Sequence, residues 1–309
     1  MIESAGFALA LLCAVLMGYG VQRGATCAVS AMDEIVSKRS ARKLIAIIEA
    51  GLWVAGGLLV LRALGLTMAT PTGYAVGAST VAGGILLGLG ALVNRACVFG
   101  TVARIGSGEW VYLLTPIGFL AGCFVAAPYA LPLRAEAISP VIAASFYLLI
   151  PFALLALWRL WQAGRAARSG ALARHIWSPH MATVVIGIAF VIMLITVGSW
   201  AYTEALADFA MGKIGGLNPR MILLGGLFAG SVLAGWIGGQ IRHQRPTLGV
   251  ALRCLAGGAL LGAGGVLVPG SNDGLLLLGI PLLQPHAWLA FAMMMAAIWI
   301  GLVAMRRLA

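Results

Sequence analysis

Two cysteines of the chain share a local glycine pattern that the other cysteines lack. Glycines stand nine and seven positions before Cys27 and, 70 residues later, before Cys97. These glycines are Gly18, Gly20, Gly88 and Gly90. A protonated thiol is a weak hydrogen-bond donor, so a soft sulphur anion held by thiols is bound weakly enough to leave quickly. The spacing therefore predicts that Cys27 and Cys97 belong to one path. The alternative is that both are incidental residues of loops at the membrane surface.

A third copy of the pattern carries a hydroxyl in place of the thiol. Gly262 and Gly264 precede Ser271 at the same spacing. We predict that Ser271 also lies on the path. The alternative is an ordinary turn residue, because Pro-Gly-Ser-Asn-Asp-Gly is rich in turn formers. Polar and glycine residues at the helix ends are expected to support the path: Gln22, Asn94, Gly270 and Asn272. The cysteines without the pattern are expected to lie outside it: Cys13, Cys123 and Cys254.

The composition requires a membrane as the solvent for the elements that position these residues. The chain is 61% hydrophobic and 9% charged, with a mean hydropathy of +1.02, which excludes a soluble globular domain. The prediction is one transmembrane domain, 1–309, of the all-α polytopic class, with about nine transmembrane helices plus short re-entrant helices. Apolar runs of about 20 residues place the spans. They are 4–20, 41–65, 73–93, 107–131, 139–162, 181–199, 219–240, 247–267 and 285–305. The first has no basic region before it, so we expect a retained span and no signal peptide.

Basic residues orient these spans. With the N-terminus outside and the C-terminus cytoplasmic, four basic residues face outward: Arg62, Arg134, Lys213 and Arg220. The other sixteen lie on the inner side: Arg23, Lys38, Arg39, Arg42, Lys43, Arg95, Arg104, Arg159, Arg165, Arg168, Arg174, Arg242, Arg245, Arg253, Arg306 and Arg307. This asymmetry follows the positive-inside rule and accounts for the net charge of +11. The expected partner of this charge is the lipid bilayer, not nucleic acid.

The three motif copies predict an inverted pseudo-repeat. The first two copies lie on the inner side and the third on the outer side, as in inverted-topology transporters. We assign 1–135 to the first half-repeat, 136–179 to a connecting span with a basic cytoplasmic loop, and 180–309 to the second half-repeat. Segments 21–36 and 94–105 are too short to cross and are predicted to be re-entrant, with each cysteine near the N-terminus of a half-helix. A fourth short element is expected near 200–214, although no Gly-x-Gly stands there.

Acidic residues within or beside the spans are the remaining candidates for chemistry. Glu49 falls inside a span, where proton coupling competes with a hydrogen bond inside the bundle or an orientation toward the inner face. Glu204 and Asp208 fall where the fourth short element is expected, and solvated outer-face residues are the alternative. Asp273 beside Ser271 is predicted to cap a short helix. No catalytic residues, cofactor or metal site are expected, since the histidines show no ligand-like pairing.

Three segments resemble the YeeE/YedE family of bacterial sulphur-transport membrane proteins. They are Gly18-Tyr-Gly-Val-Gln-Arg-Gly-Ala-Thr-Cys27, Asn94-Arg-Ala-Cys97-Val-Phe-Gly-Thr101 and Gly262-Ala-Gly-Gly-Val-Leu-Val-Pro-Gly-Ser271-Asn-Asp-Gly274. The second is close to the family pattern Asn-x-x-Cys-x-Phe-Gly-Thr. The resemblance implies nine spans with re-entrant helices, thiosulfate uptake, and three pathway cysteines that pass the anion by transient S–H···S hydrogen bonds. Two positions match, Cys27 and Cys97, while Ser271 stands in the segment where the family has its third cysteine and a histidine.

The predicted function is a permease of the bacterial plasma (inner) membrane for a small thiosulfate-like anion. In this hypothesis the anion passes along Cys27 and Cys97, with Ser271 at the outer mouth. The resemblance also implies a partner, a small cytosolic TusA-like sulfurtransferase. The alternative from another class is a membrane sulphur-transfer protein that carries a persulfide on Cys27 or Cys97.

Overall fold

The computed structural model describes most of the chain as helices. The described residues are 2–25, 27–66, 73–129, 139, 141, 146–170, 176–242, 246–268 and 270–308. They contain no β-strand element, and the predicted all-α polytopic class is confirmed. The longer helices are α1 Ile2–Gly24, α3 Arg42–Ala63, α4 Ala78–Asn94, α6 Leu114–Ala126, α8 Leu149–Arg168, α10 Pro179–Val197, α12 Pro219–Ile237, α13 Leu248–Leu267 and α15 Pro285–Leu308. The short α-helices are α2 Ala28–Lys38, α5 Val98–Gly106, α11 Tyr202–Ala210 and α14 Ser271–Gly274.

Short 3-10 and π segments extend several of these helices. They are η1 Trp110–Leu113, η2 Ala127–Tyr129, η3 Phe146–Leu148 and the π segment η4 Leu275–Gly279. Among the described residues, eight helical segments are long and apolar enough to cross a membrane. One of them, Ala5–Lys38, includes both α1 and α2. The predicted fifth span, 139–162, lies partly outside the described residues; α8, its described part, carries three arginines and is not one of the eight.

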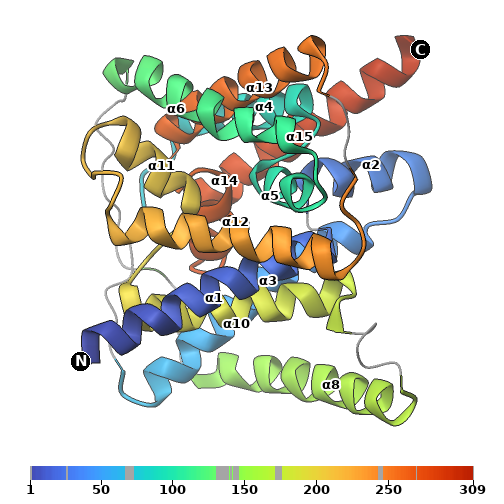
Figure 1. Ribbon diagram of the computed structural model, residues 1–309. Coiled ribbons are helices and arrows are strands. Elements are labelled where there is room, and N and C mark those ends of the chain that lie inside the picture. Colours follow the sequence, from blue (N-terminus) through green and yellow to red (C-terminus); the bar gives the residue numbers. More distant parts are fainter. Residues whose placement is uncertain are drawn as a thin grey trace.

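The bundle has two helical groups that meet at the short helices (Figure 1). In one group α1 packs against α10 and α12, and α3 packs against α10. In the other, α13 packs against α4 and α6, and α15 packs against α4. Each of these groups therefore combines helices from both halves of the sequence, while α8 lies at the edge of the bundle (Figure 1).

The glycines of the motif lie where these helices cross. A Cβ atom at Gly90 would lie 2.7 Å from the backbone nitrogen of Leu261 in α13, and one at Gly264 would lie 2.9 Å from the carbonyl oxygen of Gly83 in α4. The remaining motif glycines also face a neighbouring helix: Gly18, Gly20, Gly88 and Gly262. Small residues let helix backbones approach closely in a membrane, where lipid provides no hydrophobic drive for association. The motif glycines thus set the helix packing that surrounds the cysteines.

Glu49 is bound inside the bundle. Its carboxylate forms a bidentate ion pair with the Arg159 guanidinium of α8, and His180 Nδ1 of α10 lies 2.8 Å from Glu49 Oε2. Trp53 Nε1 donates to Glu49 Oε1 at 3.4 Å. Glu49 and Arg159 are both buried, so each removes the penalty of the other's unpaired charge. Of the alternatives for Glu49, the structure shows hydrogen bonds that join α3, α8 and α10.

Candidate functional site

Cys27 and Cys97 lie side by side although 70 positions separate them. Their Sγ atoms are 3.7 Å apart, and both thiols are free. Cys27 is the N-cap residue of α2 and Cys97 that of α5, so each thiol stands at the start of a short helix. The backbone N–H of Ala28, the first residue of α2, donates to Cys97 Sγ at 3.2 Å. Unpaired N–H groups at a helix start favour an anion, and here one already points at sulphur.

Gly100 makes room for this pair. A Cβ atom at Gly100 would lie 2.5 Å from Cys27 Sγ, closer than non-bonded carbon and sulphur approach. The residue lies in the first turn of α5, one turn after the Cys97 cap. Glycine is therefore the residue that lets the Cys27 thiol rest against the backbone of α5.

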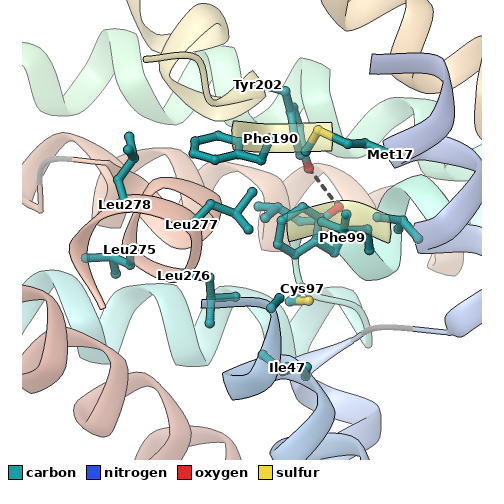
Figure 2. Close-up of a cluster of buried hydrophobic side chains, with 14 of the residues drawn as sticks. Met17, Ile47, Cys97, Phe99, Phe190, Tyr202, Leu275, Leu276, Leu277 and Leu278 are labelled. Atoms are coloured by element: carbon teal, nitrogen blue, oxygen red, sulfur yellow. Dashed lines mark hydrogen bonds between the residues drawn. The ribbon is translucent and has the colours of Figure 1, made fainter. Parts of the chain in front are cut away.

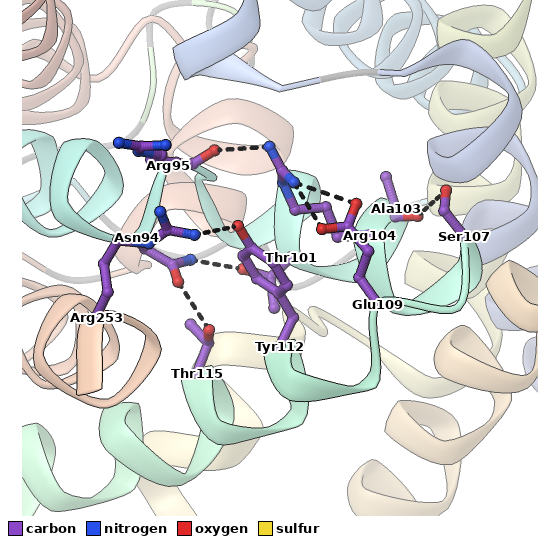
Figure 3. A network of polar contacts seen from close by, with 10 residues as sticks. All are labelled: Asn94, Arg95, Thr101, Ala103, Arg104, Ser107, Glu109, Tyr112, Thr115 and Arg253. Carbon is purple, nitrogen blue, oxygen red and sulfur yellow. Dashed lines mark hydrogen bonds and ion pairs between the residues drawn. The ribbon is translucent and has the colours of Figure 1, made fainter. Parts of the chain in front are cut away.

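A buried asparagine fixes the position of α5. Asn94 is fully buried, and its side-chain nitrogen donates to the Ala96 carbonyl at 2.9 Å. The same nitrogen donates to Thr101 Oγ1 at 3.0 Å (Figure 3). Thr115 of α6 donates to Asn94 Oδ1 at 2.9 Å. The amide thus joins the end of α4, the start of α5 and α6. The predicted role of Asn94 as a support of the path stays a prediction.

Helices α11 and α12 hold α5 from the other side. Tyr202 of α11 donates its hydroxyl proton to the Val98 carbonyl at 2.7 Å (Figure 2). Ser231 of α12 donates to the Val102 carbonyl at 2.8 Å. Both carbonyls face the inside of the bundle, where no water replaces these bonds. The short helix α5, whose N-cap residue is Cys97, is therefore hydrogen-bonded to α4 through Asn94, to α11 and to α12.

A polar cavity opens beside Cys27. Its volume is about 600 Å³, and its lining includes Cys27, Gly100, Gln22, Arg95 and Arg104. Gln22 donates to Gln240 Oε1 at 2.7 Å across this end of the bundle. Arg104 forms a bidentate ion pair with Glu109, with the shorter contact at 2.9 Å (Figure 3). Of the two thiols, the half-buried Cys27 lines this cavity, while Cys97 is buried behind it.

Apolar side chains pack around Cys97 on the side toward η4. Phe99 lies with Leu276 and Leu277 in one buried cluster (Figure 2). The void between these three side chains and α3 and α10 measures about 20 Å³, room for about one water molecule. A tetrahedral sulphur anion does not fit there without movement of these side chains.

The turn Ser271–Asn272–Asp273, called the outer turn after the side on which the sequence predicts it, is buried. Ser271 is 3% exposed and Asn272 is fully buried. Within the described residues, Ser271 Oγ and both amide atoms of Asn272 have no hydrogen-bond partner. Buried polar side chains are almost always paired, so an unpaired buried amide indicates a site that is completed by something else. Gly270, with φ +86°, is the N-cap residue of this turn.

Asp273 caps a helix other than its own. Its carboxylate accepts from the backbone N–H of Thr203 at 3.2 Å and from the Thr203 hydroxyl. Thr203 lies in the first turn of α11, whose N–H groups have no partner within the helix. The short element expected near 200–214 is thus present as α11, and Asp273 binds its N-terminus.

Glu204 lies beside the same turn. A Cβ atom at Gly274 would lie 3.5 Å from Glu204 Oε1. Burial, and after it the nearby Asp273 charge, raise the pKa of the Glu204 carboxyl to about 7, although Arg220 acts to lower it. Burial likewise raises the pKa of the Asp273 carboxyl to about 6, against the Thr203 hydrogen bonds, which lower it. Asp208, at the far end of α11, is half-buried and pairs with Arg220 at 3.0 Å.

Sequence reasoning found the residues of the two centres but not their closest contacts. Cys27 and Cys97 are adjacent in the structure, while Ser271 and Asn272 lie in another short helix, α14, which packs against α5. The residues it missed are Gly100, Tyr202 and Thr203. Gly100 stands within the segment Asn94–Thr101 that carries the family resemblance, and this was the available signal. Cys13, Cys123 and Cys254 are buried in helix interiors, away from the N-cap positions that Cys27 and Cys97 occupy.

Membrane-spanning helices, short helices inside the bundle and a polar cavity together define a multi-pass membrane transport protein. The family model described as sulphur transport matches residues 23–300, and the chain belongs to this family. The resemblance to YeeE/YedE proteins is therefore confirmed. The thiosulfate transporter TsuA of Escherichia coli (strain K12) is 24% identical over 335 aligned positions, which cover 94% of this chain and 92% of that relative. The chain is a transport protein and not an enzyme.

Proposed function

We propose that the chain is a permease of the bacterial plasma membrane that carries thiosulfate or a similar sulphur anion into the cytoplasm. The observation that carries this proposal is the Cys27–Cys97 pair, 3.7 Å apart at two helix starts, with Cys27 on the cavity lining. The family and the activity named for TsuA support the choice of substrate. The excess of basic residues on the inner loops supports the orientation with the N-terminus outside.

The proposed pathway begins at the outer turn and ends in the inner cavity. Ser271 and Asn272 receive the anion first, because the predicted orientation places them on the outer side and their side-chain polar atoms have no partner in the described part of the chain. Movement of Phe99, Leu276 and Leu277 then admits the anion to Cys97. The two thiols next share it through S–H···S and S–H···O contacts, which are weak and therefore quick to break.

The cavity supports the last step electrostatically. Arg95 and Arg104 line it together with Cys27. Glu109 neutralises Arg104, so Arg95 supplies the positive charge that attracts an anion leaving the thiols. The same arginines offer a docking place for the acidic or thiol-bearing partner that the family implies, a TusA-like sulfurtransferase. Permeation by the purified chain needs no such partner in this proposal.

The two-half organisation is part of the same proposal. Residues 1–135 and 180–309 are inverted half-repeats, joined by 136–179. The short helices α2, α5, α11 and α14 supply the re-entrant elements that this scheme requires. Reporter fusions after Gly170 read cytoplasmic in this orientation, and fusions after Gly212 read external. The same side for both defeats the topology.

The test of the function is uptake by the purified chain in liposomes. Labelled thiosulfate, sulfite and sulfide are offered to the wild type and to Cys27→Ala and Cys97→Ala. We expect saturable thiosulfate uptake that both variants lose, while Cys254→Ala retains it. Absence of uptake of all three anions by folded wild-type protein rejects the proposal. A mass increase of one sulphur atom on Cys27 or Cys97, retained without transport, supports the persulfide alternative instead.

A further inference from the structure

We infer that the outer turn binds a proton together with the anion, with Glu204 and Asp273 as the proton-accepting groups, so that uptake is coupled to proton entry. This inference rests on the proposed function and concerns the outer end of its pathway. It assigns a role to two carboxyl groups, the buried Asp273 and the half-buried Glu204, for which anion transport by the thiols has no use.

The first step of the argument is electrostatic. Two carboxylates stand beside the place where the proposed pathway receives an anion. Asp273 is 2% exposed, and among the described residues no lysine or arginine pairs with it. An ionised carboxylate in this position repels a sulphur anion strongly, because little water screens the interaction. The site therefore accepts an anion only after at least one carboxyl group has taken up a proton.

The second step is that the turn has unused donors and acceptors. Ser271 Oγ and the Asn272 amide are buried without a partner in the described part of the chain. They belong to the same four-residue helix as Asp273. An amide nitrogen and a hydroxyl are suitable donors to the oxygens of an anion. The turn thus holds groups for the anion and a group for the proton within consecutive residues.

The third step concerns the other charges near the pair. Helix α11 contributes Tyr202 and Asp208, and α12 contributes Arg220. Arg220 is committed to Asp208, at 3.0 Å, and Lys213 lies 3.3 Å from the same carboxylate. Three other elements pack on α14, and one of them, η4, carries no ionisable side chain. The charged side chain of α13 is Arg253, which donates to the Tyr112 hydroxyl. The charged side chain of α5 is Arg104, which pairs with Glu109.

The sign of the coupling follows from linkage. Burial raises the pKa of Glu204 to about 7 and that of Asp273 to about 6, so both groups change charge near neutral pH. Proton binding raises the affinity for the anion, and the anion raises the affinity for the proton by the same factor. A group with a pKa of about 7 is protonated roughly tenfold more at pH 6 than at pH 8. Uptake below saturation is therefore expected to rise about tenfold as the external pH falls over this range.

The transport step needs no covalent chemistry. A proton from the outer solution neutralises a carboxylate of the pair, and the anion binds to the Asn272 amide and the Ser271 hydroxyl. When the anion moves on toward Cys97, the carboxyl group loses the stabilising neighbour and releases its proton to the inner side. Each cycle moves the anion and at least one proton in the same direction.

The experiment measures both movements at once. The full chain is reconstituted in liposomes that contain a pH-sensitive dye, with the membrane potential clamped by potassium and valinomycin. Labelled thiosulfate is added outside. We expect the lumen to acidify in step with uptake in the wild type. In Asp273→Asn and Glu204→Gln we expect downhill uptake of thiosulfate to continue. At least one of the two variants should fail to acidify the lumen. In that variant the uptake rate should vary less than about twofold between pH 6 and pH 8.

The matched control is Glu34→Gln, which removes a carboxylate from another short helix, α2, and leaves Glu204, Asp273 and the Asp208–Arg220 ion pair intact. It is expected to keep both acidification and the pH dependence. Wild-type uptake without acidification overturns the inference and leaves the proposed function standing. Wild-type acidification retained in both variants also overturns it. If neither variant folds, the wild type alone provides the test. Calorimetry of thiosulfate binding in two buffers of different ionisation enthalpy measures the number of protons taken up on binding. Binding without proton uptake overturns the inference.

Absence of any uptake by folded wild-type protein is a different outcome. It rejects the proposed function, and with it the coupling that rests on that function. Uptake without proton movement rejects the coupling alone.

Discussion

The cysteine pair and the outer turn both lie at the starts of short helices, but they differ in whether the polar atoms around them are hydrogen-bonded. Around the pair, the Ala28 N–H donates to Cys97 Sγ, and Asn94 satisfies the turn that precedes α5. In the outer turn, the Asn272 amide and the Ser271 hydroxyl have no partner among the described residues. An unpaired thiol costs little when buried, whereas an unpaired amide or hydroxyl costs about 1–3 kcal/mol.

In the proposed pathway, this difference gives the outer turn and the thiols different roles. The outer turn keeps an unfavourable arrangement that a bound anion would relieve, so its groups are suited to capture from water. The thiols gain little from any one contact, so they are suited to release. A harder, oxygen-directed site would then precede a softer, sulphur-directed one.

The strongest way to break this comparison is to remove a thiol. Cys97→Ala or Cys27→Ala should lower thiosulfate uptake by more than about tenfold, which corresponds to about 1.4 kcal/mol in the limiting barrier. The reason is that the remaining thiol has no neighbour to which it passes the anion. Initial rates in liposomes at matched protein content measure the effect. Cys13→Ala, Cys123→Ala and Cys254→Ala are the controls, and loss of uptake in these with retention in Cys97→Ala would contradict the assignment.

Gly100 tests the geometry of the pair without touching a thiol. Gly100→Ala places a methyl group 2.5 Å from Cys27 Sγ and must displace the sulphur. We expect uptake to fall about fivefold, since displacement weakens the transfer between the thiols and leaves both in place. The control is Gly225→Ala in α12, where no atom lies within 4 Å of the added carbon. Equal uptake by the two variants would show that the close approach of Cys27 to α5 has no functional importance.

The sequence predicted the elements better than the contacts between them. Apolar runs located eight spanning segments because the bilayer sets their length, and the glycine spacing selected the two cysteines that meet. The Asp273–Thr203 contact and the Glu49–Arg159 ion pair join positions 70 and 110 apart, and no local pattern encodes such pairs. No Gly-x-Gly precedes the helix α11, so the motif that predicted the other short elements gave no signal for this one.

Asn272 sharpens the contrast between function and stability. Replacing it with Leu removes an amide that has no partner among the described residues, so Asn272→Leu should raise the thermal stability while uptake falls about threefold to fivefold. Asn94→Leu is the matched control, because its amide makes three hydrogen bonds, and this variant should lose stability. Thermal unfolding in detergent and uptake in liposomes give the two quantities. A loss of stability in Asn272→Leu as large as in Asn94→Leu would show that Asn272 has a structural partner and no free binding capacity.

Substitution of Ser271 should have the smallest effect on uptake, and it tests whether the outer turn prefers oxygen-rich anions over softer sulphur anions. Its hydroxyl is a stronger and harder donor than a thiol, and it rotates to suit an oxyanion. Ser271→Ala should therefore lower uptake about twofold to threefold, because one of the capture groups of the outer turn is lost while Asn272 remains. Ser271→Cys should leave a working protein whose preference moves from sulfite toward sulfide, since it gives the outer turn the donor of the inner pair. Both variants keep a side chain at a position with φ +45°, so the backbone strain is the same in all three proteins. Competition of sulfite, sulfide and unlabelled thiosulfate against labelled thiosulfate separates selectivity from rate. Identical competition profiles for Ser, Ala and Cys at this position would remove Ser271 from the pathway and leave capture to Asn272 alone.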